Sequence, residues 1–277
     1  MESMQELWWR VLESEAYLWA VCISFFVLIE RVFPRVRAQP PWRKEWGQDV
    51  GWLVLNVFLN HSWARVVAVL SIFELSNLDA IWRSHVPALD SMAGWPLLAQ
   101  FAIVFVVADF LAWYLHRLSH RNGFLWRFHV LHHSSERMDW LATFRGHWID
   151  GVFLDLSYVL PLALLPVDFR VLILFGAFDL LAVTYLHANL PIGRRPGWLF
   201  RWVGSPVAHH WHHSAENRLK YGQNFGRYTL IWDRLFGTFH LPADHAAPER
   251  FGLQEQGKYY RGFFRRFFMP FVSRGNL

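Results

Sequence analysis

Long apolar stretches separated by short polar segments dominate the chain. A run of about 20 apolar residues is long enough to cross the hydrocarbon core of a bilayer. The first three stretches therefore each predict one transmembrane helix. The fourth is interrupted by two prolines and predicts a helical hairpin that enters the membrane and returns to the same side. The stretches cover residues 16–33, about 50–75, about 96–115 and 149–188.

The basic residues between the apolar stretches predict the orientation. Residues 34–47 carry four basic side chains, and residues 121–147 and 192–240 are also basic, whereas residues 1–15 are polar and acidic. Short basic loops mark the cytoplasmic side. The pattern therefore predicts an all-α integral membrane protein with three transmembrane helices, a helical hairpin and a cytoplasmic helical cap. Four independent spans are the alternative.

The composition supports a membrane location. Hydrophobic residues make up 54% of the 277 residues and charged residues 18%, and the 17 Trp fit side chains anchored at the lipid–water interface. The net charge is +5, and basic and aromatic residues alternate in the segment 259–268. That mixture favours an anionic membrane surface over nucleic acid as a partner. The single cysteine, Cys22, excludes a disulfide within the chain and argues against a cysteine-ligated cluster.

Three histidine motifs carry the candidate chemistry. One HxxxH motif is followed by two HxxHH motifs, and residues three or four apart share a face of a helix. Imidazole is a good ligand for Zn, Fe, Cu and Ni. Eight clustered ligands exceed the need of one tetrahedral zinc, so the motifs predict a dimetal site. The eight are His116, His120, His129, His132, His133, His209, His212 and His213.

Two acidic residues lie in apolar stretches close to these motifs. Asp109 precedes His116 by seven residues, and Asp179 precedes His187 by eight. A carboxylate inside a membrane span is costly and usually functional. We expect both to orient a ligand imidazole, with pairing to an Arg or Asn of the second stretch as the alternative for Asp109. His187 lies where its helix would leave the membrane and is a candidate ninth ligand.

Four segments resemble the fatty acid hydroxylase superfamily, which includes sterol desaturases, sterol methyl oxidases and alkylglycerol monooxygenase. They read DFLAWYLHRLSH, LWRFHVLHHSSE, PVAHHWHHS and YGQNFGRYTLIWDRLFGTF. The resemblance covers about residues 45–240 of a single domain, 1–277, between the polar N-terminus 1–15 and the basic-aromatic tail 241–277. It implies an integral membrane enzyme whose two metals, usually iron, activate O2 to hydroxylate or desaturate lipid C–H bonds.

The resemblance also implies roles for individual residues. It assigns the eight motif histidines as metal ligands, and His187 matches a further family histidine. Val183 stands where some members have a tenth, and His210 has no assigned role. His147 matches a recurring family histidine. The resemblance implies that it is a metal ligand or lies near the site, and the alternative is a structural pairing with Asp150.

Three further polar residues match recurring family positions. They are Glu136, Asn224 and Asp233. We expect Glu136 near the site, and Asp233 fits equally well as a structural brace through Arg234 or through backbone amides.

The expected function is that of a membrane di-iron oxygenase acting on a fatty acyl, sterol or ether lipid, with zinc possible as the purified metal. The chain shows no GxGxxG motif and no cysteine cluster. Its electrons should therefore come from a ferredoxin, a cytochrome b5-like carrier or a pterin. A membrane dizinc hydrolase and a non-enzymatic metal-binding membrane protein are the alternatives. The expected location is a bacterial inner membrane, with the metal site facing the cytoplasm.

Overall fold

A computed structural model describes most of the chain. The described residues are 4–59, 84–85, 91–92, 94–191, 201–216, 222–242, 248–254 and 262–272. The predicted second span therefore lies outside them from residue 60 onward, as does much of the tail.

The described residues form helices and connecting loops, with isolated bridges in place of strands. This agrees with the all-α prediction. The α-helices are α1 (Met4–Val32), α2 (Trp46–Leu59), α5 (Leu97–Arg121), α6 (Gly123–His129), α7 (Trp148–Leu164), α8 (Phe169–His187), α9 (Pro206–His212), α10 (Ile231–Leu235) and α11 (Phe263–Val272). Two short 3-10 helices are η2 (His132–Ser134) and η3 (Trp140–Phe144).

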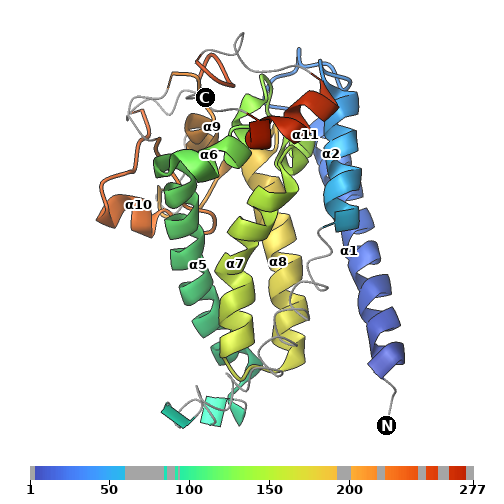
Figure 1. Ribbon diagram of the computed structural model, residues 1–277, viewed down its shortest axis with the longest axis vertical. Helices are drawn as coiled ribbons and strands as arrows, with labels where there is room; N and C mark the ends of the chain where they lie inside the picture. Colours follow the sequence, from blue (N-terminus) through green and yellow to red (C-terminus); the bar gives the residue numbers. More distant parts are fainter. Residues whose placement is uncertain are drawn as a thin grey trace.

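Helices α5, α7 and α8 stand side by side and form the main bundle (Figure 1). Their shared core includes Val104 and Ala108 of α5, Leu162 of α7 and Phe175 of α8, all buried. Ala108 and Ala112 are four residues apart and buried, and small residues at this spacing let helices approach closely. In lipid, such packing depends on van der Waals fit, because lipid tails are as apolar as Leu.

Two of the described helices are long and apolar enough to cross a membrane: α5 and the segment Arg170–His187 of α8. The 25 residues of α5 extend about 37 Å, more than a hydrocarbon core of about 30 Å. The predicted first span, 16–33, coincides with the second half of α1 except for its last residue, and its crossing of the membrane stays a prediction.

The predicted hairpin is present as α7 and α8, joined by residues 165–168. Asp168 caps α8 by accepting a hydrogen bond from the Arg170 amide at 2.8 Å. Pro161 lies inside α7, and the helix continues to Leu164 before it ends. The hairpin brings the start of α7 and the end of α8 to one end of the bundle, where α5 ends and where α6 and α9 lie (Figure 1).

Buried ion pairs fasten the N-terminal part of the chain to this end. The Arg43 guanidinium donates to both carboxylate oxygens of Asp139 at 2.5 and 2.8 Å. Arg145 donates to Asp49 at 2.5 Å and to Glu45 at 3.0 Å. Buried charges are tolerated when paired and hydrogen-bonded in this way. The network fixes the loop that contains Arg145, whose carbonyl belongs to the site described next.

Candidate metal centre

The structure gathers nine histidines into two adjacent groups at the end of the bundle. Within each group the ligand nitrogens lie within 4.8 Å of one another. The first group contains His116, His120, His129, His133 and His212, and the second contains His132, His187, His209 and His213. The ring centroids of His133 and His213 are 4.4 Å apart, so the two groups touch.

The groups divide each HxxHH motif between them. His129 and His133 join the first group, whereas His132 joins the second. His209 and His213 likewise stay together in the second. Residues four apart differ by about 40° around a helix and residues three apart by about 60° in the opposite sense. The i, i+4 pairs therefore share one group and the i+3 residue turns toward the other.

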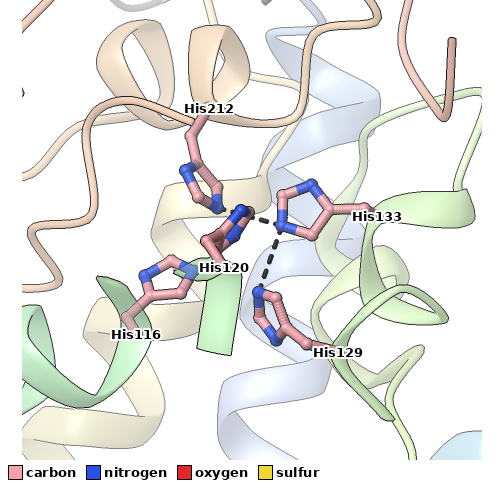
Figure 2. A group of neighbouring side chains, drawn as sticks. All are labelled: His116, His120, His129, His133 and His212. Atoms are coloured by element: carbon pink, nitrogen blue, oxygen red, sulfur yellow. Dashed lines mark hydrogen bonds between the residues drawn. The ribbon is translucent and has the colours of Figure 1, made fainter. Parts of the chain in front are cut away.

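Figure 2 shows the five rings of the first group turned toward one another. The Nε2 atom of His133 lies 3.1 Å from that of His129 and 3.0 Å from that of His212. The Nε2 atoms of His116 and His120 are buried and have no hydrogen-bond partner among the described residues. Each is an unused lone pair or N–H inside the protein.

The second group has the same arrangement. Its Nε2 atoms form a chain from His132 to His187 at 3.1 Å, from His187 to His209 at 3.1 Å and from His209 to His213 at 3.0 Å. The four residues come from η2, α8, α9 and the residue after α9. Helices distant in sequence therefore each contribute part of one nitrogen cluster.

Hydrogen bonds on the far side of the rings determine which nitrogen faces the centre. A carbonyl oxygen only accepts, so an Nδ1 atom bonded to a carbonyl carries the proton and Nε2 carries the lone pair. His132 donates to the Arg145 carbonyl at 3.1 Å, and His187 donates to the Val183 carbonyl at 2.8 Å. Their bare Nε2 atoms then face each other without a proton between them. A bound cation resolves this repulsion, so the residues fit a metal.

Three more rings are held in the same way. The Nδ1 atoms of His116 and His212 donate to the carbonyls of Phe225 and Gln223 at 2.9 and 2.7 Å. The Nδ1 atom of His129 lies 3.0 Å from Asp150 Oδ2. Such partners set the tautomer and the ring orientation of metal-binding histidines.

Burial keeps five of the motif imidazoles neutral. Burial, with a smaller contribution from the neighbouring His129, lowers the pKa of His132 to about 4. It also lowers the pKa of His133, His209, His212 and His213 well below the ordinary value. A neutral imidazole is the form that binds a metal. The centre is therefore ready to accept cations at neutral pH.

Comparisons with known proteins agree with this geometry. The family model for the fatty acid hydroxylases matches residues 101–238. The ornithine lipid hydroxylase OlsE of Rhizobium tropici is 31% identical over 99% of this chain and 78% of its own length. The chain belongs to the fatty acid hydroxylase family.

Two other relatives match more distantly. The cholesterol 25-hydroxylase-like protein of Danio rerio is 27% identical over 87% of this chain and 100% of its own length. The human alkylglycerol monooxygenase is 30% identical over 60% of this chain and 36% of its own length, so the match spans about a third of that protein. No solved structure matches.

Some residues expected at the site of this hydroxylase-family chain have other roles. Asp109 was expected to orient an imidazole, or to pair with an Arg or Asn of the second stretch. Its carboxylate instead accepts hydrogen bonds from the Tyr228 and Thr229 amides, the Thr229 hydroxyl and the Trp232 indole. It therefore anchors the loop 222–230 to α5. Its effect on the histidines passes through that loop, which carries the Phe225 carbonyl.

Asp233 braces the same loop from the other side. Its side chain accepts from the amides of Phe225 and Gly226 at 2.9 and 2.7 Å and from the Thr238 hydroxyl at 2.6 Å. Of the two braces considered for Asp233, the structure shows the one through backbone amides. Asn224 is a second brace, with its amide bonded to the carbonyls of Ala208 and His240.

Glu136 lies at the surface and belongs to neither group. Its side chain is 42% exposed and contacts Lys44 at 3.4 Å. Its partner is Lys44 and not an imidazole, although it follows His133 by only three residues.

His147 and His210 are buried but belong to neither group. His147 Nδ1 accepts from the Ile149 amide and so caps α7, and its Nε2 donates to the Phe267 carbonyl at 3.2 Å. With both nitrogens in use, it is not placed as a ligand. His210 turns away toward Arg35, 2.6 Å from its Nδ1.

Asp150 is the orienting carboxylate that sequence reasoning missed. It was considered only as a partner of His147, three residues before it. The structure pairs it with His129, which lies 21 residues away. The available signal was an acidic residue in the first turn of a helix beside the histidine-rich segment.

A cavity of about 220 Å³ opens beside the two groups and extends between the helices. Histidines of both groups line it, together with apolar residues of α5, α7 and α8 and several polar side chains. Leu18 and Trp19 of α1 close one side. Asp179 also lines this cavity. We expected it to orient an imidazole, but its carboxylate bonds to Arg227 and Tyr228 instead.

Proposed function

We propose that the chain is a membrane-bound di-iron oxygenase that uses O2 to hydroxylate a C–H bond of a lipid. The observation that carries the proposal is the pair of histidine groups, whose bare nitrogens converge beside a cavity between apolar helices. A lipid segment in that cavity would lie directly beside both metals.

The first group would hold one iron and the second group the other. Neutral imidazoles add no negative charge, so two divalent ions keep strong Lewis acidity. When bound, such a pair supplies the activation of O2 and the oxidising power needed for an unactivated C–H bond. Membership of the fatty acid hydroxylase family supports this choice over hydrolysis or metal storage.

The chain's own residues prepare the site for that chemistry. Hydrogen bonds to Asp150 and to the backbone carbonyls hold the rings in one tautomer, so ligand geometry exists before metal binds. Apolar side chains such as Leu162 and Leu172 line the cavity and exclude water. Exclusion of water protects a strong oxidant from side reactions and keeps the lipid next to the metals.

The names of the relatives favour hydroxylation over desaturation. The three relatives described above are named as hydroxylases or a monooxygenase. Each of these names states a lipid as the substrate of that relative, which supports a lipid substrate here. We further propose that the electrons come from a separate carrier, and that the metal end of the bundle faces the cytoplasm of a bacterial cell.

The deciding experiment is Mössbauer spectroscopy on protein expressed with ⁵⁷Fe and purified without oxygen. We expect two coupled irons per chain that oxidise when O2 is added. The same protein, given a reductant, ¹⁸O2 and membrane lipid, should produce a lipid that has gained one ¹⁸O atom. Tightly bound zinc that iron cannot replace in an active form would refute the proposal.

A further inference from the structure

The short helix α10 has the reverse of the polarity expected at an aqueous surface. It buries Asp233 and exposes Ile231 and Leu235, which are four residues apart and share one face. A helix at an aqueous surface normally turns its apolar side to the protein and its polar side to water. Leu235 is 68% exposed, and Phe236, which follows it, is 49% exposed. The outward face of α10 therefore suits an apolar environment better than water.

The segment 201–203 enlarges this apolar face. The Leu230 amide donates to the Trp202 carbonyl at 2.7 Å, and Val203 pairs with Thr229 in an isolated bridge. Trp202 and Val203 are exposed as well. Exposed apolar patches of this kind mark sites of interaction with a protein or a membrane. The α10 patch, as we call this surface, consists of Trp202, Val203, Ile231, Leu235 and Phe236.

The α10 patch lies beside a helix that is long and apolar enough to cross a membrane. Helix α10 packs against α5 on the side away from α7 (Figure 1). The Trp232 indole donates to Asp109 at 3.0 Å, and its ring centroid lies 4.9 Å from that of Phe110. Phe236 stacks on Trp113 with their centroids 4.6 Å apart. Aromatic contacts therefore fix α10 to the middle part of α5.

These contacts fall within the apolar stretch of α5. Asp109, Phe110 and Trp113 precede His116, the first residue after that stretch, by seven, six and three residues. At a rise of about 1.5 Å per residue, the contacts lie about 4 to 10 Å inside the end of the stretch. Helices that lie in a membrane interface bury their apolar face to a depth of about 5–10 Å. With α5 across the membrane, α10 has the depth of an interfacial helix.

The exposed apolar surface of α5 continues onto the α10 patch. Val106 and Tyr114 are exposed and lie four residues before and after Phe110, on the same face of α5. The Phe110 ring stacks on Tyr114 and also packs against Trp232. A membrane-spanning helix meets lipid wherever protein does not cover it, so the patch adjoins a lipid-facing surface.

The charge next to the patch also fits a lipid interface. The Arg234 guanidinium lies over the rings of Trp202 and Phe239, 4.6 and 3.8 Å from their centroids, and its Nε donates to the Arg201 carbonyl. Arg234 has no carboxylate partner among the residues that the structure describes. At a membrane interface, arginines lay their stem on apolar surface and reach lipid phosphates. An acidic protein would match the charge but would not explain the depth along α5.

We infer that the α10 patch is inserted into the leaflet at which the histidine end of α5 emerges, with Leu235 and Phe236 among the acyl chains. This inference goes beyond the oxygenase proposal and shares with it only the membrane location of α5. The last part of the segment 192–240, expected to be cytoplasmic, then touches lipid. The loop 222–230 directly precedes α10 and carries the carbonyls of Gln223 and Phe225, so this contact also fixes the depth of the metal centre.

The test places an environment-sensitive fluorescent label at single positions of the full, metal-loaded chain. The vesicles contain equal amounts of phosphatidylcholine and phosphatidylglycerol. Cys22→Ser removes the natural buried thiol, and Leu235→Cys carries the label. Val106→Cys on α5 is the lipid reference, and Glu136→Cys, at an exposed surface position, is the water reference.

Two quenchers report the surroundings of each label. Iodide in the water should quench the label at 235 about 10-fold less than the label at 136, because an ion enters an apolar region only at high cost. A lipid with a doxyl group close to its headgroup should show the opposite preference. Ile231→Cys, on the same face of α10, should behave like Leu235→Cys.

The remaining outcomes overturn the inference in distinguishable ways. Iodide quenching at 235 as strong as at 136 would place the patch in water. Protection of the label at 235 from both quenchers would show that a protein surface, such as a second copy of the chain, covers the patch. Either result leaves the oxygenase proposal standing. Iodide access at 106 would instead remove α5 from the membrane, and with it both the inference and the membrane location in the proposed function.

Discussion

Replacing Asp150 should weaken one metal site and leave the other almost unchanged. Its carboxylate lies 3.0 Å from His129 Nδ1, and the two side chains are 6% and 0% exposed. His129 belongs to the first group only. Asp150→Ala removes the acceptor that holds the ring, whereas Asp150→Asn keeps an oxygen in place and removes the charge.

The size of the effect follows from the burial of this contact. A hydrogen bond to a charged group contributes about 1.5–3 kcal/mol, and solvent does not screen one as buried as this. Loss of such a partner typically lowers metal affinity about 10- to 100-fold. We expect Asp150→Ala to reach the upper part of that range and Asp150→Asn the lower part.

The assay titrates iron-loaded protein with a chelator and counts the metal that stays bound. The wild type should keep two irons up to a chelator concentration at which Asp150→Ala retains one. Asp168→Asn is the matched control, because that carboxylate is in an exposed pair with Arg170. The reasoning would be refuted if Asp150→Ala kept both irons at every chelator concentration at which the wild type keeps both.

Three further predictions concern the histidines and their support. His212→Ala should lose metal and activity with the chain still in the membrane, whereas His210→Ala should keep both metals; metal analysis of the two adjacent variants tests the group assignment. Gly222→Ala should lower metal loading and the melting temperature, because φ is +88° and a Cβ atom would lie 3.1 Å from His120 Nδ1; an unchanged melting temperature would contradict it. Metal-free protein should lose stability as the pH falls from about 6.5 to about 4, because the unfolded chain binds protons there and buried His132, with its pKa of about 4, does not. The difference is about 3 kcal/mol for His132 alone, and a denaturation midpoint independent of pH between 7 and 4 would refute it.

The sequence predicts the local parts of this site well. Helical spacing brings His116 near His120 and His129 near His133, because i and i+4 share a face whatever the rest of the chain does. Hydrophobic runs likewise predict α5 and the α7–α8 hairpin, and Pro166 lies in the turn between the two helices. These features depend on neighbours in sequence.

The partners of single polar residues could not be predicted in this way. Asp109 and Asp150 are both acidic and both close in sequence to a motif histidine. One anchors a loop 119 to 123 residues away, and the other contacts His129. Neither outcome follows from spacing, because each depends on which distant segment folds against the helix.

By itself, the sequence determined the helical class, the histidine pairs and the number of metals to expect. Only the tertiary structure decided how the nine histidines divide into two groups, and that His132 faces His187 rather than His133. It also placed Asp179 and Arg227 together in the cavity. The reason is physical: the period of a helix directs a side chain around its own axis, whereas a metal site is closed by helices whose relative positions come from packing.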